Sequence, residues 1–162
     1  MSEIIKVGMA DMKLCNAPDG LTTLGLGSCV GVTMYDPITK VSGMLHLMLP
    51  DSTHIRNNQN IAKFADTGIK ELYNCMLKKG ACAGRIVAKI AGGAQMFSYG
   101  GGNSEIMSVG QKNVEATKRI LSELKIKIVA EDTGLNYGRT IIFDSQTGSL
   151  KIRAVGKQET II

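Results

Sequence analysis

The feature that most constrains the fold is a pair of apolar runs separated by one short turn. Residues 29–35 and 41–49 are rich in apolar and β-branched side chains, and the sequence Asp-Pro-Ile-Thr stands between them at 36–39. Aspartate followed by proline is typical of a type I turn. The pattern therefore predicts an antiparallel hairpin, with the glycine-flanked Cys29 at its start and His46 on its second strand.

A loop of the four residues 36–39 brings Cys29 and His46 together. Tyr35 and Lys40 then form the first pair, and the numbers of paired residues sum to 75. Cys29 and His46 have that sum, so we expect them to lie directly opposite each other, with Cβ atoms about 4.5–5.5 Å apart. A thiol and an imidazole at this spacing can hydrogen-bond, and a β-bulge would shift the register.

A cysteine nucleophile beside a histidine base is the smallest set of side chains that supports nucleophilic acyl transfer. The imidazole can take the proton of the thiol and later give it to a leaving group. A third group usually orients the imidazole, and Thr23 is a candidate because it lies on the preceding predicted strand. Backbone amides of the glycine-rich turn can serve as an oxyanion hole. The structural alternative is that Cys29 only packs, as a lone buried cysteine usually does.

The rest of the chain predicts several strands and two substantial helices. Strands are expected at 21–24, 85–91 and 126–130, and a second hairpin at 139–144 and 150–155. Apolar residues at three- and four-residue steps predict a helix from Ile61 to a stop near Gly80, and a second helix over 114–124. Residues 51–59 are a polar loop with His54, and 98–110 a glycine-rich loop. This order indicates an α+β or mixed α/β fold with helices covering sheet faces.

Length and composition limit the remaining possibilities. A chain of 162 residues is expected to form one domain, residues 1–162. No segment reads as a signal peptide or membrane span, which favours the cytoplasm. The four cysteines have no paired spacing and the chain has only two histidines, so we expect no metal and no cofactor. We interpret Cys15 as part of a loop, and Cys75 and Cys82 as structural or surface thiols.

The charge pattern does not indicate nucleic-acid binding. The net charge is +5, but the basic residues are scattered and aromatic residues are only 4% of the chain. A solvated surface is the plain interpretation, and steering toward an acidic partner is the second. The glycines at 25 and 27 do not match a dinucleotide fingerprint, because a strand follows them and not a helix. The glycine run at 100–102 lacks the lysine and hydroxyl of a phosphate-binding loop.

Several blocks in order along nearly the whole chain resemble the CheD family of chemoreceptor glutamine deamidases. The blocks are Thr22-Thr23-Leu24-Gly25-Leu26-Gly27-Ser28-Cys29-Val30, His46-Leu47-Met48-Leu49-Pro50-Asp51, Ala65-Asp66-Thr67, Lys89-Ile90-Ala91-Gly92-Gly93-Ala94 with Met96-Phe97, Gly110 with Asn113-Val114-Glu115-Ala116, and Ala130-Glu131-Asp132-Thr133-Gly134. One departure is Leu135, where the family commonly has a second glycine. The departure bears on the conformation of that loop and not on the chemistry.

The resemblance implies a reaction and roles for three residues. Selected glutamine side chains on methyl-accepting chemotaxis receptors would be hydrolysed to glutamate, with Cys29 as nucleophile, His46 as base and Thr23 orienting it. Methylesterase activity is a related hypothesis, because esters are easier acyl substrates than amides. The implied fold is α+β, with packed sheets and outer helices like those of cysteine-dependent deamidating toxins of the cytotoxic necrotizing factor type.

The resemblance also implies a partner, a CheC-type phosphatase. This leaves a rival function of another class, in which the chain is a non-enzymatic regulator that acts mainly by binding the phosphatase or the receptor. Deamidation of a receptor fragment that is lost when Cys29 is replaced discriminates the enzyme from the regulator.

Overall fold

The computed structural model describes residues 2–96 and 108–162, which form two β-sheets and two α-helices. The first sheet has the order β1 (Ile4–Lys6), β3 (Gly20–Leu26), β8 (Arg139–Asp144), β9 (Ser149–Arg153), β10 (Thr160–Ile161). The second has the order β2 (Met12–Asn16), β5 (Val41–Leu47), β4 (Val30–Tyr35), β6 (Val87–Gly92), β7 (Lys127–Thr133). The helices are α1 (Ala65–Lys78) and α2 (Val109–Glu123), with short 3-10 turns η1 (Ile61–Lys63) and η2 (Ala83–Arg85).

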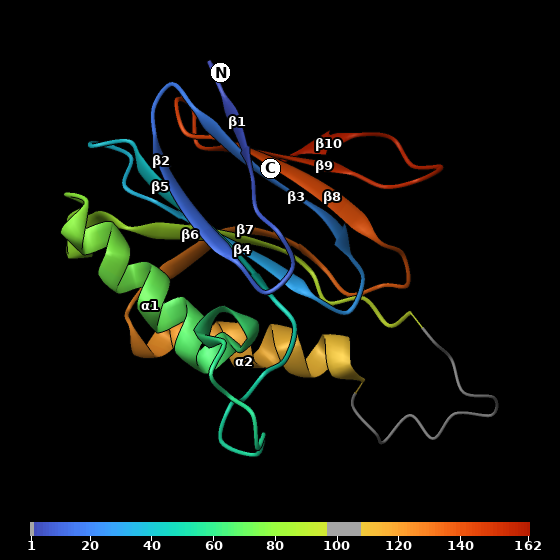
Figure 1. Ribbon diagram of the computed structural model, residues 1–162. Coiled ribbons are helices and arrows are strands. Elements are labelled where there is room, and N and C mark those ends of the chain that lie inside the picture. The colour runs from blue at the N-terminus through green and yellow to red at the C-terminus, as the bar shows by residue number, and fades with distance from the viewer. Residues whose placement is uncertain (1, 97–107) are drawn as a thin grey trace.

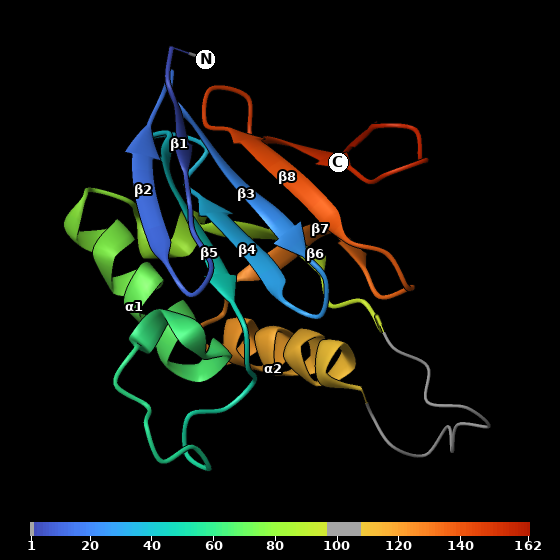
Figure 2. The same ribbon diagram turned by 45° about the vertical axis from the view of Figure 1, so that its right-hand side comes forward.

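The elements stack in three layers. The second sheet lies in the middle, with the first sheet on one face and α1 and α2 on the other (Figures 1 and 2). Both sheets are mixed, since β1 runs parallel to β3 and β6 runs parallel to β7 while their other pairs are antiparallel. The predicted α+β class, with helices outside packed sheets, is therefore confirmed.

The middle position of the second sheet explains its composition. Every residue of β5 is buried, and five of the six in β4 are, because one face of each strand packs on the helices and the other on the first sheet. The apolar stripe of α1 (Ile69, Leu72 and Met76) packs with α2 against one face. Leu21, Leu26 and Ile141 of the first sheet fill the space against the other face. Two cores therefore share one sheet.

The hairpin of β4 and β5 forms as predicted, but its register differs from the prediction, because each residue pairs with one two positions away from its predicted partner. The four loop residues are 37–40, because Asp36 still pairs with Val41 through its backbone N–H at 3.0 Å. The buried Asp36 carboxylate accepts from Ile38 N, and Lys40 takes a left-handed φ of 62° that closes the loop. Paired numbers therefore sum to 77, and Gly31, not Cys29, lies opposite His46.

Three other expectations differ from the structure. Helix α1 begins at Ala65 and not at Ile61, because Ile61 belongs to the 3-10 turn η1 and Phe64 is extended. Cys15 is buried in β2 and does not lie in a loop. Strands β1 and β2 were not predicted, since their short segments lack a run of β-branched residues, and they are recognisable only once they pair with β3 and β5.

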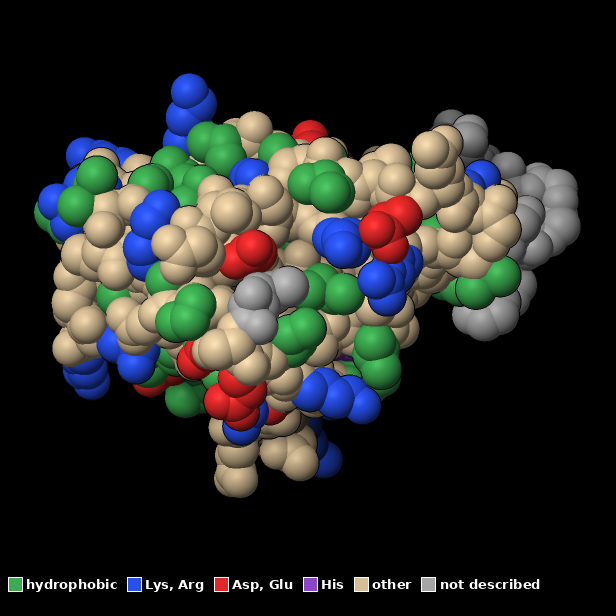
Figure 3. All heavy atoms as spheres, turned by 90° about the horizontal axis from the view of Figure 1, so that it is seen from above, with side chains coloured by type: hydrophobic (Ala, Val, Ile, Leu, Met, Phe, Trp, Pro, Cys, Tyr) green, Lys and Arg blue, Asp and Glu red, His purple; other side chains and the backbone are tan. Residues whose placement is uncertain are grey.

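The second hairpin and the later elements agree with the sequence. Strands β8 and β9 flank a turn at 145–148, and β6 and β7 lie where strands were expected. Helix α2 forms as expected but begins at Val109, because Ser108 caps it, so the predicted loop at 98–110 is wrong at its last two residues. The glycine run at 100–102 lies outside the described residues. In the described part of the chain, no helix is long and apolar enough to cross a membrane. Basic and acidic side chains lie interspersed on the face in Figure 3.

Candidate active site

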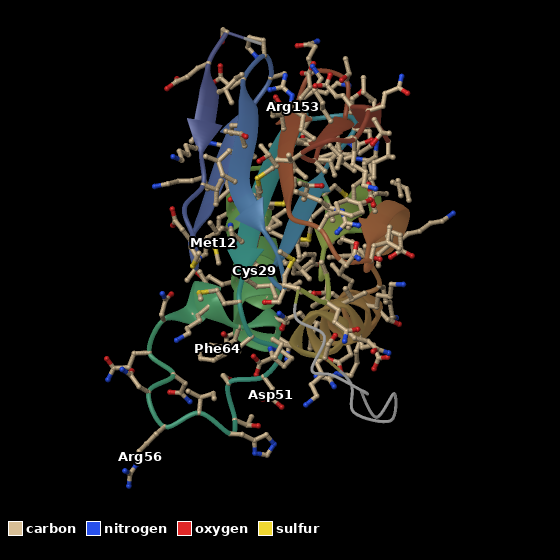
Figure 4. All side chains as sticks on the ribbon, turned by 90° about the vertical axis from the view of Figure 1, so that its right-hand side faces the viewer. Met12, Cys29, Asp51, Arg56, Phe64 and Arg153 are labelled. Carbon is tan, nitrogen blue, oxygen red and sulfur yellow. The ribbon has the colours of Figure 1, made fainter. Side chains whose placement is uncertain are left out.

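The three residues singled out in the sequence come from three places in the fold. Thr23 is on β3 of the first sheet, His46 is on β5 of the second, and Cys29 lies in the bend that joins β3 to β4. Cys29 lies at the end of the sheets nearer Asp51 and Phe64, while Arg153 lies toward the other end (Figure 4). The candidate site therefore lies where the two sheets face each other, beside the bend at residues 27–29 that joins β3 to β4.

The contact between Thr23 and His46 crosses the gap between the two sheets. Both side chains are buried, and Thr23 Oγ1 lies 2.7 Å from His46 Nδ1. The hydroxyl also donates its only proton to the carbonyl of Val7 at 2.8 Å. Thr23 Oγ1 must therefore accept from Nδ1–H, which places the lone pair of the neutral imidazole on Nε2.

The N-terminal segment holds the backbone of His46 as well as the hydroxyl of Thr23. The backbone N–H of His46 donates to the carbonyl of Asp11 at 3.0 Å, and the N–H of Ala10 donates to the carbonyl of His46 at 2.9 Å. The segment from Val7 to Asp11 therefore fixes both the strand position and the ring of the histidine. Sequence reasoning missed this role, because these contacts are long-range backbone bonds with no side-chain motif.

Glycines hold the backbone of Cys29 from the other side. The N–H of Gly93 donates to the carbonyl of Cys29 at 2.8 Å, and the N–H of Ala94 donates to the carbonyl of Gly27 at 2.9 Å. A Cβ atom on Gly92 would lie 2.3 Å from the Cys29 carbonyl oxygen, so only glycine permits this approach. The glycines at the end of β6 therefore fix the position of the cysteine backbone.

The resting thiol and imidazole are not hydrogen-bonded to each other. His46 Nε2 is buried and has no hydrogen-bond partner among the described residues. In the observed register Gly31 lies opposite His46, and Cys29 stands two residues before Gly31, in the bend that precedes β4. The sequence prediction of a directly opposed pair is therefore wrong in register, although it places the two residues near the same edge of the hairpin.

Burial keeps both groups neutral. It raises the pKa of the Cys29 thiol above its ordinary value and lowers the pKa of the His46 imidazole below its ordinary value. The backbone N–H of Cys29 acts in the opposite direction on its own sulfur, and it is the smaller of the two influences. At neutral pH the resting site therefore holds a thiol and an imidazole whose Nε2 is free to accept a proton.

Asn113 of α2 is a further buried polar residue at the site. Its side-chain amide donates to the carbonyl of Ser28 at 2.9 Å and to the carbonyl of Met48 at 3.0 Å. It therefore joins the residue before Cys29 to the chain just beyond β5. The helical periodicity places Asn113 on the buried face of α2, but no local pattern identifies its two partners.

Neither of two hollows on the described surface, one beside Gly93 and one beside Pro50, is lined by Thr23, Cys29 or His46. The first, of about 320 Å³, is bounded by Gly93, Gln95, Ser108 and the loop with Gly134 and Leu135. This hollow adjoins the bend at residues 27–29 through Gly93, whose N–H donates to the Cys29 carbonyl. Cys29 itself is 8% exposed, so little of the residue reaches solvent in this structure.

The loop after β7 keeps the backbone shape that a glycine would adopt. Leu135 has a φ of 60°, in the left-handed region, and its side chain is exposed. Its carbonyl accepts from the N–H of Gln95 at 2.8 Å, which ties the loop to the segment after β6. The leucine therefore changes the surface of the loop while its backbone conformation is retained at a cost of about 1 kcal/mol.

The remaining residues singled out in the sequence lie away from these contacts. His54 is exposed in the loop after β5, Cys75 is half-buried on α1, and Cys82 is exposed. Cys15 packs in the core between the sheets. Within the described ranges no group of three His, Cys, Asp or Glu side chains lies close enough together to hold a metal ion.

Comparison with known proteins gives one consistent result. Residues 48–154 match the family model CheD, described as chemotactic sensory transduction. A protein of Lachnoclostridium phytofermentans named "Probable chemoreceptor glutamine deamidase CheD" is 61% identical over 98% of both chains. One of Caldanaerobacter subterraneus with the same name is 57% identical over 96% of this chain and 95% of its own. The "Chemoreceptor glutamine deamidase CheD" of Halalkalibacterium halodurans is 48% identical over 98% of both chains.

Proposed function

Because the chain belongs to the CheD family, we propose that it hydrolyses the side-chain amides of selected glutamine residues on chemotaxis receptors to give glutamate. The chain is accordingly an enzyme, a protein-glutamine glutaminase. The observation that most supports this chemistry is the buried imidazole of His46, which is held at Nδ1 by Thr23 and free at Nε2. An acyl-transfer base requires this arrangement.

In the proposed mechanism Cys29 is the nucleophile. His46 Nε2 takes the thiol proton, and the sulfur attacks the carboxamide carbon of the glutamine side chain. The C–N bond then breaks, His46 gives its proton to the departing nitrogen, and ammonia leaves a thioester on Cys29. Water, activated by the same nitrogen, hydrolyses the thioester to glutamate and restores the thiol. Thr23 keeps the proton of the neutral ring on Nδ1 throughout.

The contact between thiol and imidazole has to form during the reaction, because Nε2 has no partner at rest. Rotation of the short Cys29 side chain toward His46 is the movement that we propose for it. Catalytic hydrogen bonds commonly tighten only when substrate is bound. Exclusion of water by the substrate then strengthens the interaction between the developing thiolate and imidazolium.

Exposed apolar side chains near the site suit a protein substrate. Met96 packs on Gly27 beside the nucleophile and is 44% exposed. Met9 adjoins Ala10, which binds the His46 carbonyl, and Leu24 follows Thr23; their exposures are 59% and 49%. Exposed apolar groups around a functional site favour docking of another apolar surface. We propose that a receptor segment contacts the exposed side chain of Met96 beside Cys29.

The decisive experiment incubates the protein with a receptor fragment that contains glutamine. We expect ammonia release and a mass gain of about 1 Da at each modified glutamine, as hydrolysis of an amide requires. Cys29→Ala should abolish both signals, whereas Cys82→Ala, which removes an exposed thiol elsewhere, should retain them. In ¹⁸O-water each new glutamate should also acquire one heavy oxygen, because water cleaves the thioester. Unchanged receptor mass with the parent protein would overturn the proposed activity.

Further features of the proposal rest on the sequence and on the family resemblance. They are binding of a CheC-type phosphatase, methylesterase activity, a cytoplasmic location and a fold like that of cytotoxic necrotizing factor-type toxins. Binding of the phosphatase without any change of receptor mass would favour the regulator over the enzyme. Absence of methanol release from a methylated receptor would remove the methylesterase hypothesis.

A further inference from the structure

Asn113 binds two backbone carbonyls that bracket the site. Its amide group lies 2.9 Å from Ser28 O and 3.0 Å from Met48 O, and the residue is fully buried. Both partners can only accept hydrogen bonds, so the nitrogen of the side chain, and not its oxygen, faces them. One side chain of α2 thereby holds the chain immediately before the nucleophile and the chain two residues beyond His46.

The geometry of the peptide unit transmits this contact to Cys29. The carbonyl of Ser28 and the N–H of Cys29 belong to one planar trans unit and point in opposite directions. Fixing the carbonyl therefore fixes the direction of the N–H. The next peptide unit is fixed as well, since the Cys29 carbonyl accepts from Gly93 N at 2.8 Å. Only Cα and Cβ separate the Cys29 nitrogen from the sulfur, so this N–H belongs to the same residue as the attacking atom.

We propose that Asn113 is a positioning residue that orients the backbone N–H of Cys29 as the oxyanion donor for acyl transfer at that sulfur. This inference rests on the proposed role of Cys29 as nucleophile. An amide that lies beside the attacking atom meets the oxygen on which charge develops. The hydrogen bond from Asn113 to the carbonyl also polarises the peptide unit, which strengthens its N–H as a donor.

A purely structural role explains Asn113 poorly. Of its buried neighbours on α2, Ala116, Ile120 and Leu121 pack without polar side-chain atoms, and the hydroxyl of Thr117 is satisfied by the Asn113 backbone carbonyl. Asn113 brings a buried Oδ1 that has no partner in the described part of the chain. An unsatisfied buried acceptor costs about 1–3 kcal/mol. Retaining that cost is consistent with a task that only the two N–H donors can perform.

The test compares two reactions of the same sulfur, followed by mass spectrometry of the Cys29 peptide. Acetylation by p-nitrophenyl acetate passes through an oxyanion, whereas alkylation by iodoacetamide displaces iodide from a saturated carbon and forms none. For Asn113→Ala we expect acetylation to slow by about 10-fold or more while alkylation stays within about 2-fold of the parent. Thr117→Val is the control, since the hydroxyl of Thr117 bonds only within α2, and it should leave both rates unchanged.

The outcomes separate this inference from the proposed function. Equal loss of both reactions, or loss of neither, would overturn the role of Asn113. If Asn113→Ala does not fold, Asn113→Asp replaces it, because aspartate keeps the side-chain shape and offers at most one donor when protonated. The ratio of the acetylation rate to the alkylation rate is then compared with that of the parent in the same way. A parent protein that is acetylated at Cys29 but leaves receptor glutamines unchanged would refute the substrate and not the positioning role. A parent with no acetylation at Cys29 would overturn both.

Discussion

The histidine is the residue whose environment is most specific. Nδ1 of His46 is hydrogen-bonded to Thr23, and Nε2 has no partner among the described residues. Nε2 is therefore the ring nitrogen that can accept a proton. The hydroxyl of Thr23 achieves this only because Val7 takes its proton. A side chain with no charge therefore sets the tautomer, a task that a carboxylate performs in serine-protease triads.

Thr23→Val tests this arrangement at the scale of one atom. The change preserves the β-branched shape but leaves Nδ1–H and the Val7 carbonyl without a partner. We expect kcat to fall roughly 10- to 100-fold, because the ring can adopt the other tautomer. The free energy of unfolding should fall by about 2 kcal/mol, because buried polar groups lose their partners. Receptor deamidation per folded molecule and chemical denaturation measure the two effects.

The adjacent Thr22 supplies a matched control. Its hydroxyl donates to the Ile141 carbonyl and does not touch His46. Thr22→Val should therefore lower stability by about 1 kcal/mol and leave kcat unchanged. Equal losses of kcat in the two variants would contradict the assignment of Thr23.

The protonation states of the resting site give a second residue-scale prediction. Burial raises the Cys29 pKa, so the rate of alkylation should keep rising with pH beyond the midpoint of an ordinary thiol. Burial lowers the His46 pKa below 6.5, so the acid limb of kcat/KM should lie below that pH, because Nε2 must be unprotonated to accept the thiol proton. Rates measured from pH 5 to 10 decide both points. An alkylation rate already at its plateau at pH 7 would indicate a preformed thiolate.

Among the elements, α2 depends on a glycine for its close contact with the end of β6. A Cβ on Gly110 would lie 2.3 Å from the Ala94 carbonyl oxygen and 2.6 Å from Gly93 backbone atoms. Alanine in a helix is favoured over glycine by about 1 kcal/mol, but the clash with rigid backbone reverses the sign. We expect Gly110→Ala to destabilise the protein by about 2 kcal/mol, measured by thermal denaturation.

Gly84→Ala is the comparison for that substitution. A Cβ at Gly84 meets no atom within 4 Å, so stability should change by no more than about 0.5 kcal/mol. If Gly110→Ala were equally neutral, the close approach of α2 to β6 would not matter for stability.

The β4–β5 loop provides another element-scale prediction. Lys40 has a φ of 62°, which costs a non-glycine residue about 1–2 kcal/mol. Lys40→Gly should therefore stabilise the protein by up to about 1 kcal/mol after the greater flexibility of the unfolded chain is subtracted. Lys79, with a φ of −83° after α1, is the matched position, and Lys79→Gly should bring no gain. A loss of stability in Lys40→Gly would contradict the loop conformation that sets the register.

At the scale of the whole molecule, the shared middle sheet predicts cooperative unfolding. Strands β4 and β5 contribute to both cores, so neither core can open while the other stays packed. We therefore propose that the 162 residues fold as one domain and unfold in one transition. Far-ultraviolet circular dichroism and the reactivity of the buried Cys15 should give the same denaturation midpoint. Two separated midpoints would indicate two independent units.

The sequence predicts the helices and strands better than it predicts the contacts between them. Alternating apolar runs and turn residues locate β4, β5, β8, β9 and α2, because local backbone preferences decide these elements. The predicted register of the β4–β5 hairpin is wrong by two residues, because the register depends on where the Asp36 carboxylate caps the loop. The Thr23–His46 contact and the Asn113 contacts cross between layers, and no local pattern encodes such distances. Cys29 and His46 could be proposed from sequence because both lie on or beside one hairpin, and their catalytic roles stay predictions.

The neutral resting thiol has a consequence for oxidative damage. Peroxide attacks thiolates and scarcely reacts with protonated thiols. A sulfur that burial keeps protonated is thus shielded from sulfenic acid formation in the resting protein. In the proposed mechanism the same thiol must give its proton to His46 before it attacks, so resistance to oxidants and dependence on a base would arise from a single property, the burial of Cys29.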